Sequence, residues 1–430
     1  MRRYRVEFFL PVIFTLFVSK ALCQTSTISN PLSQHENDPY SRYGVGTPQN
    51  SNGVNLQGMG SITSAYESPY QMNTDNPASY AFLKLTTYEA GAQGTVSSVS
   101  ANNLSYKTGT ATLAYMNIGI PIGNHGGLCI GMQPRTTVYY NFADTTNTLL
   151  GTTQGLYTGS GSINYLYVGG AWRYKSLSIG VNAGYMFGTI NNSVILNVID
   201  LADSVYNSDF SQQNKIGGIY WKAGILYEHN IRKDITLRVG GTFSMKQNLN
   251  ATHNEYWIST YSLIDSFIQD TAYNASRTSG KVTLPMSYSI GVQLARTDKW
   301  LIGIDYSATK WTQYRFFGLS DSLTDAYKIS LGGEYTSGNI SSRNYFSRVT
   351  YRAGLYYGKD LVFLNNTNLN YYGFTLGCSL PVKRATSHIH LGLDIASINP
   401  KSNTMVSESF VKFSIGFSFN DKWFVKRKYD

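Results

Sequence analysis

The sequence of 430 residues has no apolar run long enough for a membrane-spanning helix, which needs about 20 residues. Charged residues make up only 14% of the chain, and the 35 basic and 25 acidic residues are scattered singly. A nucleic-acid partner is not expected, because such proteins carry clustered basic patches. Cysteine is also scarce. Cys129 and Cys378 lie far apart in predicted strands, so a disulfide framework is not indicated.

The longest apolar run lies near the N-terminus, at residues 8–18, and follows three arginines. This order of basic and apolar residues is typical of a secretory signal peptide, here residues 1–23, with cleavage expected after Cys23. A lipoprotein anchor on Cys23 is an alternative, although Lys20 and Leu22 fit that processing site poorly. An uncleaved membrane anchor would need a longer apolar core.

Aromatic residues and glycine are abundant instead, with 34 Tyr, 20 Phe and 40 Gly. High aromatic content with little charge is typical of a transmembrane β-barrel, whose aromatic residues form girdles at both membrane interfaces. A large soluble β-sandwich or an adhesin is the alternative, but it would normally carry more charge on its outer face. The composition therefore favours a barrel in the outer membrane of a bacterium.

The last predicted strand, residues 411–419, has an apolar face and a polar face. Its apolar face carries Val411, Phe413, Ile415, Phe417 and Phe419, at the period of two that a strand requires. The pattern recurs from residue 82 onward, for example at 177–182, 235–240, 302–307 and 389–396. Turn signals divide residues 82–420 into about fourteen strands, and single-chain bacterial barrels have an even number. The last strand should pair with the first, near residues 82–99, to close the wall.

The connections between the predicted strands alternate in length, as in outer-membrane barrels with a short-turn periplasmic side. Short links fall at 123–126, 174–176, 230–234, 296–299 and 381–387, and longer polar ones at 143–158, 201–211, 250–280 and 317–325. Both termini should then be periplasmic, and the apolar faces should meet lipid. Five charged residues are expected to face the lumen: Arg238, Asp305, Glu334, Asp394 and Lys412.

Two further features interrupt this pattern. Residues 24–52 are polar and turn-rich, which predicts a flexible or tucked-in N-terminal segment.

Pro134 lies inside the third predicted strand and cannot donate to its ladder, so the strand should bulge or kink there. A lateral opening of the wall and a bulge filled by a neighbouring side chain are both consistent with this proline. Pro285 is expected at a strand start or loop end.

Two short motifs lie near the N-terminus, Leu-Gln-Gly-Met-Gly at 56–60 and Asn-Pro-Ala-Ser at 76–79. In this order they resemble the N-terminal hatch of the FadL-type family of long-chain fatty-acid transporters. Leu-Pro at 284–285, with Asp305 and Trp311 further on, is similar to a strand pair of that family. The resemblance covers residues from about 40 to 420, and the order of the motifs is more specific than any one of them.

The resemblance implies a barrel plugged by its N-terminal segment, residues 24–81, and a passage for hydrophobic solutes that leaves through a gap at the third strand. The implied hatch residues are Gly58, Gly60, Asn76, Pro77 and Ala78, and the implied lateral gate is Pro134. The tail 421–430, expected to be periplasmic, departs from the family pattern because it continues past the terminal aromatic strand with a basic cluster at 426–428.

We therefore expect no enzyme and no cofactor, but an outer-membrane barrel that takes up hydrophobic, fatty-acid-like molecules, with outer-membrane lipid around it. The alternative is a non-transporting barrel that serves as a subunit or shuttle of a secretion or surface-assembly complex, since FadL-type barrels include the type IX secretion shuttle. His388 and His390 share a strand face, but no third ligand is placed nearby. They are interpreted as a solvated strand end and not as a metal site.

Overall fold

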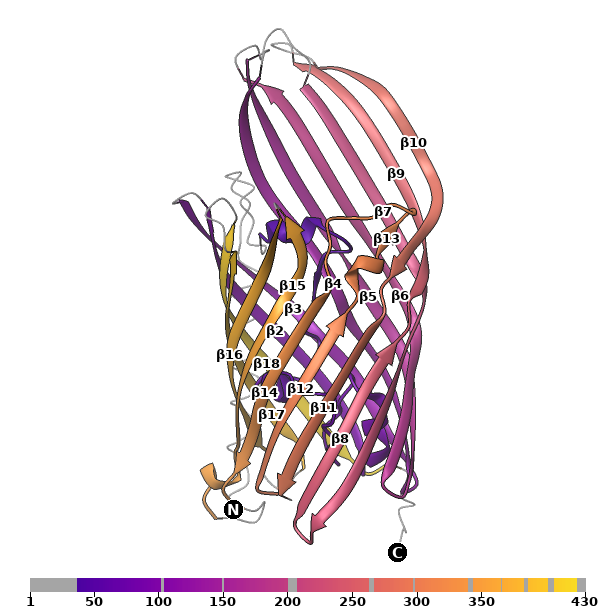
Figure 1. Cartoon of the computed structure of the whole chain (residues 1–430), viewed down its shortest axis with the longest axis vertical. Helices are drawn as coiled ribbons and strands as arrows, with labels where there is room; N and C mark the ends of the chain where they lie inside the picture. Colours follow the sequence, from indigo (N-terminus) through magenta and orange to yellow (C-terminus); the bar gives the residue numbers. More distant parts are fainter. Residues whose placement is uncertain are drawn as a thin grey trace, which may run out of the picture. The chain divides into compact units, whose positions relative to one another are not determined.

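The computed structural model describes residues 37–101, 104–148, 151–199, 207–262, 267–296, 298–338, 343–364, 366–382, 386–400 and 406–423. The expected signal peptide, Cys23 with its alternative lipid anchor, and the basic cluster of the tail lie outside these residues. Most of the described chain is β-strand (Figure 1). None of the helices in the described residues is both long and apolar enough to span a bilayer.

The strands alternate with very few helical turns. The strands are β1 (Thr47–Pro48), β2 (Thr86–Ala101), β3 (Leu104–Ile122), β4 (Gly126–Thr148), β5 (Gly151–Tyr174), β6 (Leu177–Val198), β7 (Asn207–Arg232), β8 (Ile235–Ser244), β9 (Gln247–Ser262), β10 (Phe267–Leu284), β11 (Ser287–Arg296), β12 (Trp300–Thr309), β13 (Arg315–Phe316), β14 (Ala326–Thr336), β15 (Thr350–Leu364), β16 (Thr367–Pro381), β17 (His388–Pro400) and β18 (Ser407–Asp421). The helices are η1 (Pro39–Arg42), α2 (Val54–Gln57), η2 (Pro77–Phe82), η3 (Trp311–Gln313) and η4 (Phe346–Arg348).

The strands form a closed antiparallel barrel of fourteen strands, which confirms the predicted fold class. β8 and β9 are two parts of one wall strand, and so are β10 and β11, because each pair is separated by a two-residue break. The two-residue strands β1 and β13 are not counted in the wall. The ring closes where β18 pairs with β2, with Asp421 opposite Thr86. The predicted pairing of the last strand with the first is therefore confirmed.

The last strand shows which way its two faces point. Phe413 and Phe419 are 59% and 55% exposed on the outer face, whereas Ser414 and Ser418 are buried on the inner face. Exposed apolar side chains of this kind recur on most of the wall strands. An outer face of aliphatic and aromatic side chains is what a barrel embedded in lipid presents. The predicted assignment of the apolar face to the outside is confirmed.

The connections confirm most of the expected alternation but correct part of it. The strands on either side of the predicted short links meet at one end of the barrel, and these pairs are β3–β4, β5–β6, β7–β8, β11–β12 and β16–β17. At the same end, β14 and β15 are joined by the longer stretch 337–349, which was not expected. The predicted loops 143–158 and 250–280 are wrong, because β4, β5, β9 and β10 continue through most of both stretches.

The reason for this error lies in the environment of the long strands. Residues 143–147 of β4 are exposed on both faces, so the strand meets water on both sides and needs no apolar alternation. Its threonines still favour the extended conformation. β4 to β7 are 22 to 26 residues long, whereas β12 has 10 and β14 has 11. In Figure 1, β9 and β10 extend well beyond neighbours such as β12 and β14.

Candidate functional site

Residues 51–83 fill part of the barrel interior. None of these residues is exposed. The helix α2 contacts β16, β17 and β18, while η2 contacts β3 to β7 on the other side of the ring. A segment that touches two opposite parts of the wall and has no exposed residue must lie inside the ring of strands. We call residues 51–83 the inner segment.

Two predicted hatch glycines lie where the inner segment approaches the wall most closely. A Cβ on Gly58 would lie 2.8 Å from the Gly377 Cα, and a Cβ on Gly377 would lie 2.9 Å from the Gly58 Cα. Gly60 has φ = 72°, in the left-handed region that favours glycine. Its N–H donates to Thr375 Oγ1 over 2.8 Å. Backbone contact and backbone conformation therefore explain the glycines at both positions.

The predicted Asn-Pro-Ala motif begins the helix η2. Asn76 Oδ1 accepts the N–H of Ala78 at 3.1 Å, as an N-cap does, and Pro77 occupies the first helical turn. Asn76 Nδ2 also donates to the carbonyl of Ile225 on β7 at 3.1 Å. The Ala78 carbonyl accepts a hydrogen bond of 2.6 Å from Ser178 Oγ on β6. One motif thus folds the inner segment locally and attaches it to two wall strands.

Charged side chains also connect the inner segment to the wall. Asp305 on β12, predicted to face the lumen, accepts the N–H groups of Thr63 and Ser64 at 2.6 and 2.7 Å. Arg238, also predicted to face the lumen, forms an ion pair with Glu67 of the inner segment. The remaining three lumen predictions are also correct: Glu334 pairs with Arg352, and Asp394 and Lys412 line a cavity inside the barrel.

A further ion pair joins Lys222 Nζ on β7 to Asp75 Oδ1 of the inner segment at 3.0 Å. Burial by itself raises the pKa of Asp75, but the positive charges of Lys222 and Arg135 outweigh burial and lower it below the usual value. Asp75 therefore keeps its negative charge at neutral pH and faces the Lys222 amine inside the barrel.

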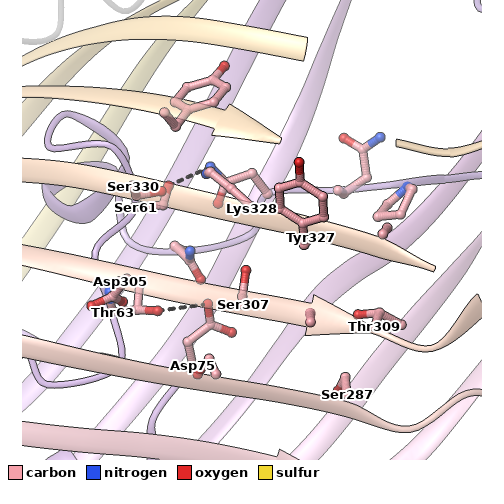
Figure 2. Close-up of a pocket in the computed structure, with 18 of the residues that line it drawn as sticks. Ser61, Thr63, Asp75, Ser287, Asp305, Ser307, Thr309, Tyr327, Lys328 and Ser330 are labelled. Carbon is pink, nitrogen blue, oxygen red and sulfur yellow. Dashed lines mark hydrogen bonds between the residues drawn. The ribbon is translucent and has the colours of Figure 1, made fainter. Parts of the chain in front are cut away.

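A cavity of about 440 Å³ lies beside the inner segment. Figure 2 shows Lys328 and Tyr327 of β14 on one side of this cavity, with Ser61, Thr63 and Asp75 of the inner segment nearby. Nine of the lining residues are charged, five basic and four acidic: Arg135, Lys222, Lys328, Lys359, Lys412, Asp75, Asp305, Asp360 and Asp394. We call this space the charged cavity.

A second, smaller cavity of about 150 Å³ is mostly apolar. It lies between residues 45–48 and the inner faces of several wall strands. Its apolar lining is Val45, Pro48, Ile163, Met186, Tyr220, Leu249, Leu284, Pro285 and Trp311. Arg135 lines both this apolar pocket and the charged cavity, so the two spaces adjoin at that side chain.

A chain of hydrogen bonds runs across six neighbouring strands on the inner face of the wall. Its members, in order, are Glu334, Arg352, Ser379, His390, Ser418 and Glu89, from β14, β15, β16, β17, β18 and β2. Glu89 Oε1 also accepts the N–H of Met72 in the inner segment at 3.0 Å. The chain therefore links the wall, the closing seam and the inner segment.

His390 corrects one expectation. Its side chain is 1% exposed and lies between two serine hydroxyls, so its interpretation as a solvated strand end is wrong. The described residues contain no group of three or more His, Cys, Asp or Glu side chains that could hold a metal ion. The two histidines stack on each other with ring centroids 6.0 Å apart, and only His390 belongs to the hydrogen-bond chain.

The third wall strand, β4, has the predicted irregularity at Pro134. The register between β4 and β5 shifts between Pro134 and Thr136, which confirms the bulge. The Pro134 carbonyl accepts a hydrogen bond of 2.5 Å from Ser51 Oγ of the inner segment. The gate role assigned to Pro134 from the family resemblance stays a prediction.

The wall is also incompletely paired beside this bulge. β3 pairs with β4 only from Met116 to Ile122. Beyond that point β4 accepts hydrogen bonds from the N-terminal segment instead, from Gln49 N to the Arg135 carbonyl at 2.8 Å and from Asp38 N to the Tyr139 carbonyl at 2.9 Å. We call the interval between the two strands the β3–β4 gap. The N-terminal segment is thus tucked in from residue 37, one of the two expected alternatives.

Sequence reasoning missed several residues of this interior. Arg352, Glu89 and Glu67 lie at inward positions of strands or in the inner segment, and each pairs with a group far away in the sequence. Arg352 alternates with apolar neighbours and could have been placed inward by period. Its partner Ser379 is 27 residues away, and no local pattern predicts that contact.

The fourteen-stranded barrel is similar in fold to several solved structures. The structure is similar to the monoaromatic hydrocarbon channel CymD, with 16% identity and a TM-score of 0.55, covering 86% of this chain and 98% of that one. It is also similar to a Pseudomonas aeruginosa FadL homologue, with 11% identity and a TM-score of 0.58 over the same shares. The Ralstonia pickettii toluene transporter TbuX has 14% identity and a TM-score of 0.54, again with coverage of 86% and 98%.

At these identities the likeness shows the fold alone. The resemblance to the FadL-type family is thus supported at the level of the fold. The sequence itself matches the family model BamG over residues 9–430, so the chain belongs to the BamG family. No curated protein matches the sequence.

Proposed function

We propose that this barrel acts as a non-transporting subunit of an outer-membrane assembly complex. The observation that carries this proposal is the lining of the charged cavity, where nine charged side chains surround about 440 Å³. Sites for apolar small molecules are lined mainly by hydrophobic and aromatic side chains with few polar groups. A hydrophobic solute would leave water only to enter another polar space, so this lumen offers it little gain in free energy.

The inner segment is proposed to act as a permanent plug, with Gly58, Gly60, Asn76, Pro77 and Ala78 as the residues that seat it. Its support comes from the backbone contact of Gly58 with Gly377 and from the hydrogen bonds of Asn76 and Ala78 to two wall strands. Each buried ion pair or charged hydrogen bond would have to break before the segment could move. A firmly held plug suits a structural subunit better than a gated pore.

The family assignment supports the same conclusion, because the name BamG hints at an association with an assembly complex. The outer membrane of a bacterium is the proposed location, supported by the apolar outer face and by the fold shared with outer-membrane channels. The partner would then be another component of that complex, and no enzymatic activity is proposed.

Deleting the gene in its host and complementing it with the tagged full chain tests the assembly role. We expect the outer-membrane levels of other β-barrel proteins to fall in the deletion strain and to recover on complementation, as measured by quantitative proteomics of isolated membranes. The tagged chain should also purify with an assembly subunit in a fixed ratio. Unchanged barrel levels together with a chain that purifies alone would overturn the proposal.

Uptake of hydrophobic small molecules is the second candidate function. Two observations favour it: the β3–β4 gap beside the Pro134 bulge, and the apolar pocket of about 150 Å³ that adjoins the charged cavity. CymD and TbuX are named as channels or transporters of aromatic hydrocarbons. In this reading a fatty-acid-like or aromatic solute would leave sideways through the gap, and Pro134 would hold the gap open.

Uptake assays separate the two candidates. Radiolabelled fatty acids and aromatic hydrocarbons would be offered to the deletion strain and to its complemented parent. Equal initial rates across the panel would exclude the transport role, while a rate that falls on deletion with normal barrel levels would favour transport over assembly.

A further inference from the structure

The edge of β3 that faces the β3–β4 gap is an unusual feature for a barrel wall. β3 pairs with β2 along nearly its whole length, from Leu104 to Gly119. On its other side it pairs with β4 only from Met116 onward. Within the part of the chain that the structure describes, no strand is paired with this side of β3 over residues 109–115. We call this stretch the β3 edge.

The exposure of the side chains shows that the β3 edge is uncovered. Ala111, Thr112 and Leu113 are three consecutive exposed residues, and Leu113 is 54% exposed. Successive residues of a strand point to opposite faces. Consecutive exposure therefore means that neither the inner nor the outer face is covered at this point, although the same strand is well packed at Ala114 and Tyr115.

The opposite side of the gap shows how the chain satisfies such an edge. There β4 pairs with the extended residues Thr47 and Pro48, and Gln49 adds a backbone hydrogen bond of 2.8 Å to Arg135. The N-terminal segment thus occupies the edge of β4 as an added strand would. It does not pair with β3. In the gap, the edge of β4 is therefore hydrogen-bonded to the N-terminal segment, and the edge of β3 has no paired strand among the described residues.

We propose that the β3 edge is a docking site for an extended β-strand of a partner polypeptide. Backbone N–H and C=O groups in a membrane must be satisfied by protein, because lipid chains offer no hydrogen bonds. Only a strand presents a matching row of backbone groups, as in β-strand addition. The proposal rests on the assembly function above and names the chemistry of its partner.

The side chains beside the edge define the kind of strand that fits. Leu113 and Met116 are exposed and apolar, and one extra residue, Ala114, in the pairing of β3 with β2 places both side chains on the outer face. Thr110 and Thr112 carry hydroxyl groups at the alternate positions. A complementary strand would carry apolar residues at every second position toward the lipid and small polar residues between them. That alternation is the pattern of barrel strands themselves.

A synthetic peptide tests this directly. The probe is an alternating Val–Thr peptide that matches residues 109–115 in length, labelled with a fluorophore and added to the full-length protein in lipid nanodiscs. The control is the same peptide with alternate backbone amides N-methylated, which removes donors but keeps the side chains. We expect fluorescence anisotropy to show binding that weakens by about tenfold or more on N-methylation. Equal binding of both peptides would overturn strand docking and indicate that the gap binds apolar side chains without backbone hydrogen bonds.

Two proline variants place the binding on the edge. Adjacent residues of a strand direct their N–H groups to opposite sides. Of Ala111→Pro and Thr112→Pro, one therefore removes an N–H that faces the gap, and the other removes one used by β2. The first should keep a folded barrel and lose peptide binding, while the second should lower the thermal stability of the barrel. If the variant that keeps its fold still binds the peptide normally, the proposed site is wrong.

The outcome is independent of the assembly role. Loss of barrel proteins in the deletion strain with no peptide binding would uphold the function and reject the β3 edge as its docking site. Peptide binding with unchanged levels of other barrel proteins would uphold the docking site and reject the assembly function. Displacement of the peptide by a fatty acid, with both peptides bound equally, would instead assign the gap to a hydrophobic solute.

Discussion

Ser418, on the last strand of the barrel, donates a hydrogen bond of 3.0 Å to Glu89 on the first strand. Because Ser418 gives its hydroxyl hydrogen to the carboxylate, its oxygen is free to accept from His390 Nε2 at 2.7 Å. His390 Nδ1 then accepts from Ser379, whose oxygen accepts from Arg352. A single direction of donors therefore runs from the Arg352 guanidinium to the Glu89 carboxylate and fixes the histidine with its proton on Nε2.

Replacing Glu89 with Ala should weaken the closing seam and the seat of the inner segment together. The change removes the acceptor of both Ser418 Oγ and the Met72 N–H, each at 3.0 Å. A buried donor left without an acceptor costs about 1–3 kcal/mol. We expect the midpoint of thermal unfolding in detergent to fall clearly, measured by the heat-dependent shift of the barrel band on a denaturing gel.

The matched control is Ser98→Ala on the same strand. Ser98 makes an exposed contact of 3.2 Å with Ser105, so its loss should leave the midpoint within error of the wild type. An equal midpoint for Glu89→Ala and Ser98→Ala would show that the seam does not depend on the carboxylate.

Replacing Arg352 with Met should be more damaging. Arg352 is 4% exposed and bonds to Glu334 Oε2 at 2.8 Å, so the variant leaves a carboxylate inside the barrel without its partner. Breaking a fully buried pair costs about 3–5 kcal/mol, and the loss here should be somewhat smaller because the Glu334 side chain is 22% exposed. The double variant Arg352→Met with Glu334→Gln should recover much of the loss, which a thermal melt of the purified barrel would measure.

An exposed ion pair provides the comparison. Arg296 and Asp234 lie 2.8 Å apart at a turn, with side chains 51% and 48% exposed. Pairs of this kind contribute about 0–1 kcal/mol, so Arg296→Met should change the melt little. Equal effects of the two arginine variants would mean that burial does not determine the strength of the Arg352 pair.

The strand number, the outward apolar face and the closing of the ring could be predicted because they follow from a local period. The position of each apolar residue in 411–419 is enough to predict which face it lies on. The pattern is regular because one face of the strand meets lipid. The pattern fails at 143–147 of β4, where both faces are exposed and the reason for alternation is lost. Strand ends of this kind therefore look like loops in the sequence.

The interior of the barrel was predictable only in part. The period placed Asp305 and Arg238 inward, and the proline predicted the bulge of β4. The sequence did not reveal that Glu67 would meet Arg238, or that residues 47–49 would take the place of β3 beside β4. Such contacts join segments far apart in the chain, and no local propensity encodes them.

Replacing Asp305 with Ala tests whether the inner segment acts as a plug. Asp305 accepts the N–H groups of both Thr63 and Ser64, so the variant removes two charged hydrogen bonds between segment and wall. We expect the segment to loosen and small polar solutes to leak through the barrel in a liposome-swelling assay. Asp144→Ala, at an exposed position of β4, should stay sealed. A tight Asp305→Ala barrel would show that other contacts suffice to hold the segment.

Replacing Pro134 with Ala tests the β3–β4 gap as an exit for solutes. Alanine supplies the N–H that proline lacks, which lets β4 straighten and pair further along its edge. If the gap releases hydrophobic solutes, the initial uptake rate should fall severalfold in this variant, as measured with radiolabelled fatty acid in the complemented deletion strain. Pro285→Ala changes a proline in the break between β10 and β11 and should leave the rate unchanged. The deletion strain should show impaired uptake. If the Pro134→Ala chain restores that uptake as fully as the wild-type chain does, the bulge plays no part in release.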